Sequence, residues 1–277
     1  MRSQSRLTQA ISKANRVKRP ARIPFLTAGC PDPDKFWDCL KELDDNGADI
    51  LEIGVPFSDP VADGPVIAAA SQKALADGVN LEWILNGLAR HSFRSPIVLM
   101  SYANPLLQYA WAEAAGQTLS EKVLVSLELL ARAMQPLVSG VIVPDVPLEE
   151  SENFRAAFEV AGIDLIVLVG PNTTSERMGK YAQVAQGYVY VVSVLGTTGV
   201  REGLPLEVKA TLARARAAFD LPLALGFGVK EPSQLSGLAR LPEAVIFGSA
   251  LVRHLTDGGC CRDFMAPWLE AAGQPAV

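Results

Sequence analysis

One acidic residue, Glu52, lies inside the apolar run Ile50–Val55, where an unpaired carboxylate is costly to bury. Such a run is typical of a buried strand, and the two-residue period of a strand puts Glu52 on the same face as Gly54, which leaves room beside it. A structural ion pair would need a Lys or Arg on a neighbouring strand, but none of the chain's eight apolar runs contains one. We therefore expect burial to raise the pKa of Glu52, so that it can donate and accept a proton near neutral pH.

A second candidate carboxylate follows directly. The loop after this run carries Asp59 and Asp63 between prolines and a glycine. Taken alone, both would be interpreted as turn-forming residues. Because the loop follows the strand that carries Glu52, we expect at least one of them to be functional. Asp63, which precedes Gly64, is the better candidate for a carboxylate that moves over a bound ligand.

Glycine-containing turns follow the last three apolar runs. Each turn alone is a weak signal, but three consecutive strand ends of this kind predict a phosphate site, in which backbone N–H groups and a helix N-terminus supply the attraction. The turns are Gly196-Thr197-Thr198-Gly199, Gly226-Phe227-Gly228 and Gly248-Ser249. The residues expected to bind phosphate are Thr198, Gly199, Gly228, Gly248 and Ser249.

Aromatic residues occur in or just after four of the same runs: Phe25, Tyr102, Tyr190 and Phe227. Any one of them would be interpreted as a core residue. Four at one end of a sheet favour a pocket for a flat aromatic substrate.

The elements that must position these groups alternate along the chain. Each run is almost continuously apolar and rich in Val, Ile and Leu, as in strands that are buried on both faces of a parallel sheet. The runs are Ile23–Ala28, Ile50–Val55, Ile97–Tyr102, Val141–Val146, Leu165–Val169, Tyr188–Val194, Leu223–Phe227 and Ala244–Phe247. Eight strands, each followed by a helix, predict a (β/α)8 TIM barrel, whose active site forms at the carboxyl ends of the strands. A doubly wound open sheet is the alternative.

Helical patterns fill the connections between the runs. They are expected at Asp34–Asp45, Glu149–Val160, Pro205–Phe219, Pro232–Leu241 and Ala250–Leu255, with residues 64–91 forming two helices broken at Gly78. The segment Leu106–Met134, after the third strand, is longer than one helix needs and is interpreted as an extra helix or a lid. We expect a single domain over residues 1–277, with residues 1–20 as an N-terminal helix or tail and residues 258–277 as a C-terminal helix or tail.

Composition narrows the class of protein. The 277 residues are 49% hydrophobic with a net charge of −5, which argues against a disordered chain and against a dedicated nucleic-acid surface. No apolar run is long enough to span a membrane. The basic first twenty residues are interpreted as an amphipathic helix carrying Leu7, Ile11 and Ala14; an organellar transit peptide is the alternative.

The positions of the cysteines and histidines argue against other kinds of catalysis. The four cysteines have no metal-site spacing and are expected to be reduced thiols of a cytoplasmic protein. The histidines, His91 and His254, are expected on helices away from the strand ends, so we expect no metal site and no histidine base. Carboxylate acid–base chemistry on a phosphorylated, partly aromatic substrate remains.

The run Leu51–Pro65 closely resembles the signature of the tryptophan synthase alpha chain family. The resemblance continues over nearly the whole chain, at Pro24–Pro31, Met100–Pro105, Pro144–Ser151, Gly226–Val229 and Gly248–Ala250. It implies the reversible retro-aldol cleavage of indole-3-glycerol phosphate to indole and glyceraldehyde 3-phosphate. By this analogy Glu52 protonates the indole ring at C3 and then takes the proton of the side-chain hydroxyl, while Asp63 accepts a hydrogen bond from the indole N–H.

The resemblance also implies a partner. Family members work with a beta chain that holds pyridoxal phosphate, so we expect an alpha2-beta2 assembly and no cofactor in this chain. Pro56, Asp59 and Asn104 are the residues expected at the partner interface. The loops 57–65 and 193–203 are expected to open and close over the substrate.

Three alternatives remain beside this interpretation. The chain could be a stand-alone lyase that releases free indole. It could be a catalytically silent protein that only activates a beta chain, although a carboxylate buried in a strand would then have no use. A sugar-phosphate isomerase or epimerase on the same barrel is the third; its metal-dependent forms would need histidines at strand ends.

Overall fold

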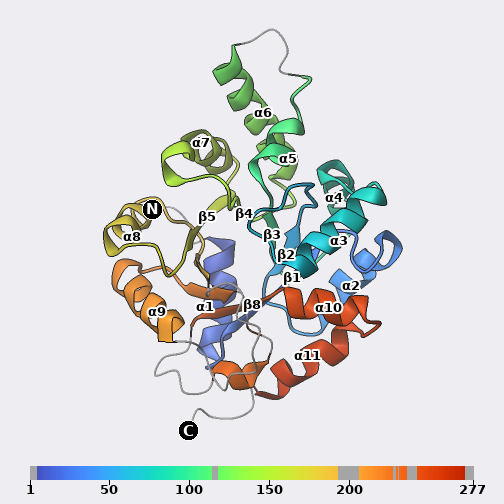
Figure 1. Cartoon of the computed structure of the whole chain (residues 1–277), viewed down its shortest axis with the longest axis vertical. Helices are drawn as coiled ribbons and strands as arrows, with labels where there is room; N and C mark the ends of the chain where they lie inside the picture. Colours follow the sequence, from blue (N-terminus) through green and yellow to red (C-terminus); the bar gives the residue numbers. More distant parts are fainter. Residues whose placement is uncertain are drawn as a thin grey trace.

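The computed structural model describes residues 5–113, 118–192, 206–226, 229, 231–235 and 242–271. Eight parallel strands close into a barrel in sequence order, β1 to β8, with β1 paired to β8 (Figure 1). The strands are β1 Ala21–Thr27, β2 Leu51–Gly54, β3 Ile97–Met100, β4 Gly140–Ile142, β5 Asp164–Val169, β6 Val189–Val192, β7 Leu223–Gly226 and β8 Ala244–Phe247. The predicted (β/α)8 barrel is confirmed, and the open-sheet alternative is wrong.

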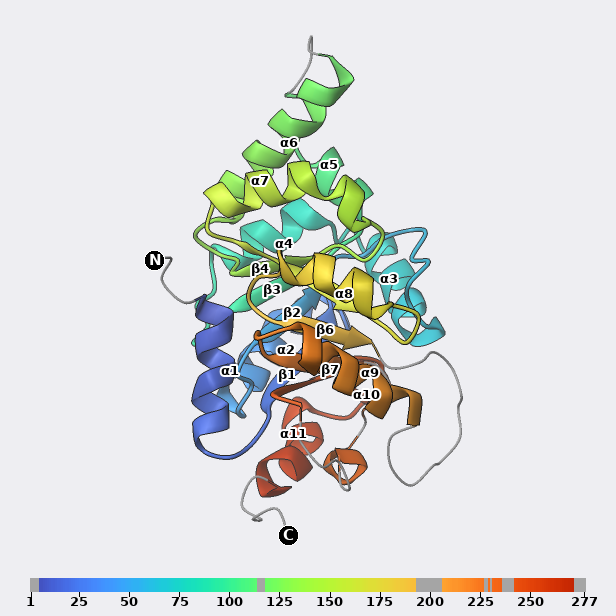
Figure 2. The same cartoon turned by 90° about the vertical axis from the view of Figure 1, so that its left-hand side faces the viewer.

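Helices surround the barrel (Figures 1 and 2). They are α1 Arg6–Arg16, α2 Pro33–Asp45, α3 Pro65–Ala76, α4 Leu81–Leu88, α5 Ala103–Gln108, α6 Leu119–Met134, α7 Glu152–Val160, α8 Ser175–Ala182, α9 Leu206–Ala218, α10 Ser249–Thr256 and α11 Cys261–Glu270, with short 3-10 helices η1 Leu148–Glu150 and η2 Pro232–Leu235. The predicted break at Gly78 is present between α3 and α4. Gly78 has a φ of +81°, a conformation that glycine adopts without strain.

Helix α1 covers the amino ends of the strands. Its apolar face, Leu7, Ile11 and Ala14, is buried as predicted. The side chain of Leu7 packs against Gly140, at the start of β4, where an added Cβ atom would lie 2.7 Å from it, and against Gly187, before β6, where that distance would be 3.2 Å. Thr8 adds a 2.6 Å hydrogen bond from its hydroxyl to the carbonyl oxygen of Gly187. With this end covered, the opposite, carboxyl ends of the strands are left for a ligand.

The segment after β3 forms α5 and the longer helix α6. Helix α6 begins with a capping box between Thr118 and Glu121. Lys122 lies 4.5 Å from the centre of the Trp111 ring and joins the helix to the chain that precedes it. Both views show α6 extending outward beyond the other helices, so the segment is an additional helix and does not lie over the barrel as a lid (Figures 1 and 2).

Some expected boundaries and placements were wrong. Strand β1 starts at Ala21 and therefore includes a cation, Arg22, whose guanidinium donates to the carbonyl oxygen of Trp268 at 2.5 Å. Strand β4 ends at Ile142, before Pro144, because proline lacks the N–H that would continue the ladder. His91 lies beyond the end of α4 rather than in a helix.

The expected helix Glu149–Val160 is divided into η1 and α7 at Ser151, whose hydroxyl bonds the carbonyl oxygen of Leu148 at 2.8 Å. Of the expected helix Pro232–Leu241, the described residues form only η2.

Candidate active site

Glu52 lies in the middle of β2, in register with Phe25 of β1 and Val98 of β3. Its side chain is fully buried, and neither carboxylate oxygen has a hydrogen-bond partner among the described residues. Burial raises the pKa of Glu52 to about 8. The group is therefore mainly protonated at neutral pH and is able to donate a proton.

The cation in β1 does not neutralise this acid. The guanidinium of Arg22 binds the carbonyl oxygens of Gly47 and Trp268. Burial and the neighbouring Arg19 lower the pKa of Arg22 to about 10. The expectation that no Lys or Arg pairs with Glu52 holds for the described residues, although its premise of cation-free strands was wrong.

The ring of Phe25 lies between Gly54, on the strand that carries Glu52, and Gly248, at the start of α10. A Cβ atom on Gly54 would lie 2.5 Å from the Phe25 ring, so the ring occupies the space that this glycine leaves open. A Cβ atom on Gly248, at the other expected subsite, would lie 3.0 Å from the same ring. One aromatic side chain thus separates the strand that carries Glu52 from the helix terminus expected to bind phosphate.

Asp63 and Tyr102 form the polar side of the site. The hydroxyl of Tyr102 accepts a 2.9 Å hydrogen bond from the backbone N–H of Ala62 and donates one to the carboxylate of Asp63. Burial raises the pKa of Asp63 to about 6, and the Tyr102 bond opposes that rise. Asp63 is therefore mainly ionised at neutral pH and able to accept a hydrogen bond from a ligand.

A cavity lies between these groups, lined by Phe25, Thr27, Gly54, Val55, Asp63, Ile67, Ser71, Met100 and Tyr102. Its volume is about 10 Å³, enough for one water molecule but too small for an indole ring. An indole ring would fit this cavity only if the surrounding side chains or the loop that carries Asp63 moved.

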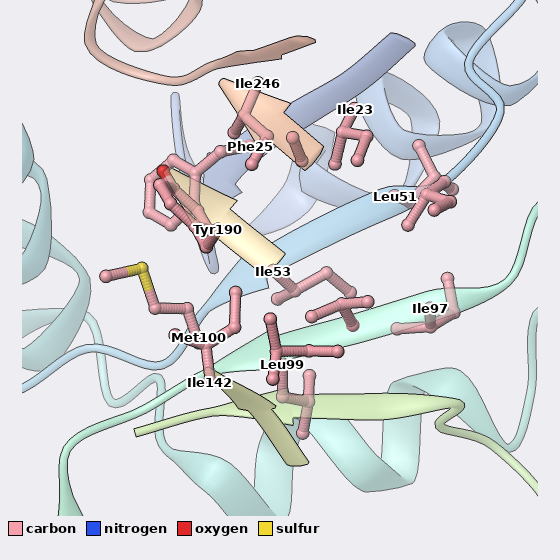
Figure 3. Close-up of a cluster of buried hydrophobic side chains, with 14 of the residues drawn as sticks. Ile23, Phe25, Leu51, Ile53, Ile97, Leu99, Met100, Ile142, Tyr190 and Ile246 are labelled. Atoms are coloured by element: carbon pink, nitrogen blue, oxygen red, sulfur yellow. The ribbon is translucent and has the colours of Figure 1, made fainter. Parts of the chain in front are cut away.

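Tyr190 lies on β6 and is buried, together with Phe25 and Met100, in the core shown in Figure 3. A Cβ atom on Gly226 of β7 would lie 2.4 Å from the Tyr190 ring, so this glycine makes room for the ring. Burial, and next the charge of Glu52, raise the pKa of Tyr190. The sequence analysis placed Gly226 in a turn expected to bind phosphate and assigned it no role beside Tyr190.

Two buried hydroxyl groups were missed by the sequence analysis. Thr27 and Tyr188 have hydroxyl oxygens that are buried and have no hydrogen-bond partner among the described residues. Thr27 lines the cavity, and the charge of Glu52 contributes to raising the pKa of Tyr188. The available signal was their position: Thr27 ends β1, and Tyr188 precedes Tyr190 by two residues and so shares its face.

The expected phosphate subsite is described in part. Gly248 is the N-cap of α10 and Ser249 its exposed first residue; among the described residues no side chain caps the N–H groups there. A helix start of this kind attracts anions. Thr198, Gly199 and Gly228, together with Phe227 of the aromatic pocket and the loop 193–203, lie outside the described residues.

The residues expected at a partner interface differ in exposure. Asp59 and Asn104 are exposed, whereas Pro56 is buried. Pro56 packs directly after the end of β2, so in this conformation its ring is not accessible to a partner. Asn104 lies in the first turn of α5, next to Ala103, whose N–H is bound by the carboxylate of Asp145 at 3.0 Å.

Other features lie away from this site. A cavity of about 320 Å³ opens outside the barrel between β5, α7 and α8, and none of the sequence-predicted site residues lines it. Among the described residues no group of three His, Cys, Asp or Glu side chains is placed to hold a metal ion. No helix in the described part of the chain is long and apolar enough to cross a membrane.

Comparisons with known proteins agree on one family. The family model for the tryptophan synthase alpha chain matches residues 11–263. The tryptophan synthase alpha chain of Nitratidesulfovibrio vulgaris (strain DP4) is 55% identical over 270 residues, which are 97% of this chain and 99% of that one.

Two solved structures have the same architecture. A structure of Mycobacterium tuberculosis tryptophan synthase superimposes with a TM-score of 0.84 at 32% identity, covering 99% of this chain and 100% of the other. Tryptophan synthase subunit alpha from Legionella pneumophila gives a TM-score of 0.78 at 29% identity, with 98% of each chain covered.

Proposed function

The chain belongs to the tryptophan synthase alpha chain family, and from this premise we propose how its own residues perform the reaction of that family. The enzyme is a carbon–carbon lyase that cleaves indole-3-glycerol phosphate to indole and glyceraldehyde 3-phosphate in the last steps of L-tryptophan biosynthesis. The sugar-phosphate isomerase alternative is therefore wrong. What remains to be assigned is the role of each side chain.

Glu52 is the general acid and then the general base. The indole carbon leaves only after protonation at C3 has turned the ring into an indolenine. An acid that is buried with no hydrogen-bond partner in the described part of the chain, and that keeps its proton up to about pH 8, is suited to that step. Once ionised, the same carboxylate accepts the proton of the side-chain hydroxyl as the C–C bond breaks. This fully buried carboxyl group, which no described residue pairs, is the observation that carries the proposal.

Asp63 stabilises the charge on the indole nitrogen. Protonation at C3 leaves positive charge at N1, and a carboxylate that accepts the N1–H hydrogen bond offsets it. The raised pKa of Asp63, about 6, still leaves the group ionised at neutral pH. Tyr102 positions Asp63 through its hydroxyl and, with Phe25, Tyr190 and Phe227, contributes the aromatic walls of the indole pocket.

The phosphate binds at the start of α10 through Gly248 and Ser249, together with Thr198, Gly199 and Gly228. Binding energy from this remote group holds the reacting carbons in place. Phe25 contacts the positions of both Gly54 and Gly248, which supports one substrate spanning the two subsites.

The chain itself needs no cofactor for this chemistry, since both proton transfers are made by Glu52. Family members work with a beta chain, and we place the pyridoxal phosphate there. The partner assembly would be alpha2-beta2, docked at exposed Asp59 and Asn104. The four free cysteines support a reducing, cytoplasmic setting.

The direct experiment supplies indole-3-glycerol phosphate to the pure chain and follows indole release, with and without a beta chain. Glu52→Gln and Asp63→Asn should each lose about 10²–10⁴-fold in turnover while still binding a phosphorylated analogue. Wild-type rates in both variants would refute the assigned roles. High activity of the isolated chain would favour the stand-alone lyase over the beta-dependent subunit, and no turnover in either assay would favour the silent partner.

A further inference from the structure

Helices α2 and α11 bring together two cysteines that are distant in the sequence. Cys39 lies in α2 and Cys261 is the first residue of α11, 222 positions later. The Sγ atom of Cys261 donates a hydrogen bond to the carbonyl oxygen of Cys39 at 3.5 Å, and the side chains of the two cysteines interact. Both helices pack on the same side of the barrel (Figure 1). The fold thus places the Cys261 side chain against residue 39, next to the Cys39 side chain.

The two thiols differ in accessibility and acidity. Cys39 is half-buried, whereas Cys261 is fully buried. The S–H group of Cys261 donates to the carbonyl oxygen of Cys39, and the interaction between the two side chains lowers the pKa of Cys39 and raises that of Cys261. Because the thiolate is the reactive form, Cys39 is the sulfur that attacks an external reagent, and Cys261 is placed to react next.

We propose that Cys39 and Cys261 form a reversible intramolecular disulfide by exchange with a low-molecular-weight disulfide such as oxidised glutathione. The Cys39 thiolate attacks one glutathione sulfur, and the first glutathione leaves as its thiolate. Cys261 then loses its proton to solvent and attacks the Cys39 sulfur, displacing the second glutathione. Overall, two protein thiols are oxidised and one glutathione disulfide is reduced to two glutathione thiols.

The other two cysteines are less suited to this reaction. The Cys30 sulfur lies 4.0 Å from the hydroxyl of Thr256 in α10, and burial raises the pKa of the Cys30 thiol. Cys260 is adjacent to Cys261, but its backbone carbonyl is bound to the ring of His254 at 3.1 Å, and it shares no thiol contact with Cys39 among the described residues. The arrangement therefore selects one pair.

The bond would attach the last described helix to the body of the protein. Helix α11 already contacts β1 and the α2–β2 connection, since the carbonyl oxygen of Trp268 accepts from Arg22 and Leu269 packs on Gly47. A disulfide that closes a ring over most of the chain restricts the unfolded state strongly. We expect the midpoint of thermal unfolding to rise by roughly 5–10 °C.

The test uses the reduced full-length protein, incubated with excess oxidised glutathione, quenched with acid and mapped by mass spectrometry under non-reducing conditions. We expect free thiols to fall from four to two, a peptide pair linked through Cys39 and Cys261, and full reversal by dithiothreitol. The link should be lost in Cys39→Ser and Cys261→Ser and retained in the matched controls Cys30→Ser and Cys260→Ser. The wild-type map alone identifies the bond, so a variant that fails to fold leaves the test intact.

Several outcomes would overturn the proposal: four thiols that stay free, a lasting glutathione adduct on Cys39, a bond through Cys30 or Cys260, or a cross-link between two chains. An unchanged or lower unfolding midpoint in the oxidised protein would contradict the stabilising role of the bond.

Discussion

The hydroxyl of Tyr102 donates a hydrogen bond to the carboxylate of Asp63 while it accepts one from the N–H of Ala62. Tyr102 lies between β3 and α5, and the other two residues belong to the loop after β2. One hydroxyl group therefore fixes both the backbone of that loop and the carboxylate it carries. A residue expected only as an aromatic wall also positions a polar group.

Replacing this tyrosine tests that positioning role. In Tyr102→Phe the ring remains, but Asp63 loses the bond that lowers its pKa, so the pKa should rise above about 6. We expect kcat/KM to fall about 10–100-fold, as for the loss of a hydrogen bond to a charged group, and the acidic limb of its pH profile to move to higher pH.

The control is Tyr181→Phe, which removes a hydroxyl that accepts a 3.0 Å hydrogen bond from Arg177 on the outside of the barrel. It should leave kcat/KM and the pH profile unchanged. An acidic limb that stays in place in Tyr102→Phe would show that Asp63 is not held by this bond.

The two carboxyl groups predict a bell-shaped pH profile for kcat/KM. Asp63 must be ionised to accept the indole N–H, so the rate should rise as the pH passes about 6. Glu52 must be protonated to act first as an acid, so the rate should fall as the pH passes about 8. Steady-state assays from pH 5 to 10 measure both limbs. A rate that keeps rising through pH 9 would contradict the role of Glu52 as the acid.

Burial of Glu52 also predicts a stability effect. The pKa of Glu52 is about 8 in the folded protein and about 4.3 in an unfolded chain, so the folded state binds the extra proton between these values. The contribution of this bound proton to the free energy of unfolding is complete below pH 4 and is lost as the pH rises to 8. Glu52→Gln is neutral at every pH, so it should be more stable than wild type by roughly 3–5 kcal/mol at pH 8 and equal to it near pH 4.

Denaturant unfolding at several pH values measures this difference. Glu128→Gln, at an exposed position of α6, is the matched control and should show no such dependence. If the difference in stability between Glu52→Gln and wild type is the same at pH 4 and at pH 8, Glu52 does not hold the extra proton inferred from its burial.

The barrel and its acid could be predicted from the sequence because both depend on local pattern. Eight apolar runs indicate buried parallel strands whatever their partners, and a carboxylate within one run is unusual wherever it occurs. The dual role of Tyr102 could not be predicted, since it depends on how the loop after β2 folds back on the end of β3. The space that Gly226 leaves for Tyr190 depends on contacts between neighbouring strands. Periodicity specifies which face a residue occupies, but not how far a ring extends across it.

Gly54 should not tolerate a side chain. An added Cβ atom would lie 2.5 Å from the Phe25 ring, so Gly54→Ala should displace the ring and lower stability by about 1–3 kcal/mol. Gly179→Ala is the control: this glycine lies in α8 with open space around it, and the change should stabilise the helix by about 0.5–1 kcal/mol. Thermal and denaturant unfolding of both variants measures the contrast.

A second substitution tests the cause. Phe25→Leu shortens the side chain that Gly54→Ala would meet, so the double variant should recover part of the lost stability, and the two changes should not be additive. Strict additivity would mean that the ring is not what excludes a side chain at position 54.

The start of α10 should bind phosphate through its backbone N–H groups, which no described side chain caps. Ser249 is exposed at the first position of the helix, so Ser249→Asp would place a carboxylate where the phosphate binds and the two anions would repel each other. We expect KM for indole-3-glycerol phosphate to rise about tenfold or more with a smaller change in kcat, because the phosphate is remote from the reacting carbons. The matched variant Ser249→Asn keeps the size of the side chain without its charge and should retain most of the affinity. Equal KM values for the Asp and Asn variants would place the phosphate elsewhere. If high salt lowers KM towards the wild-type value in the Asp variant alone, the effect is charge repulsion at this helix terminus.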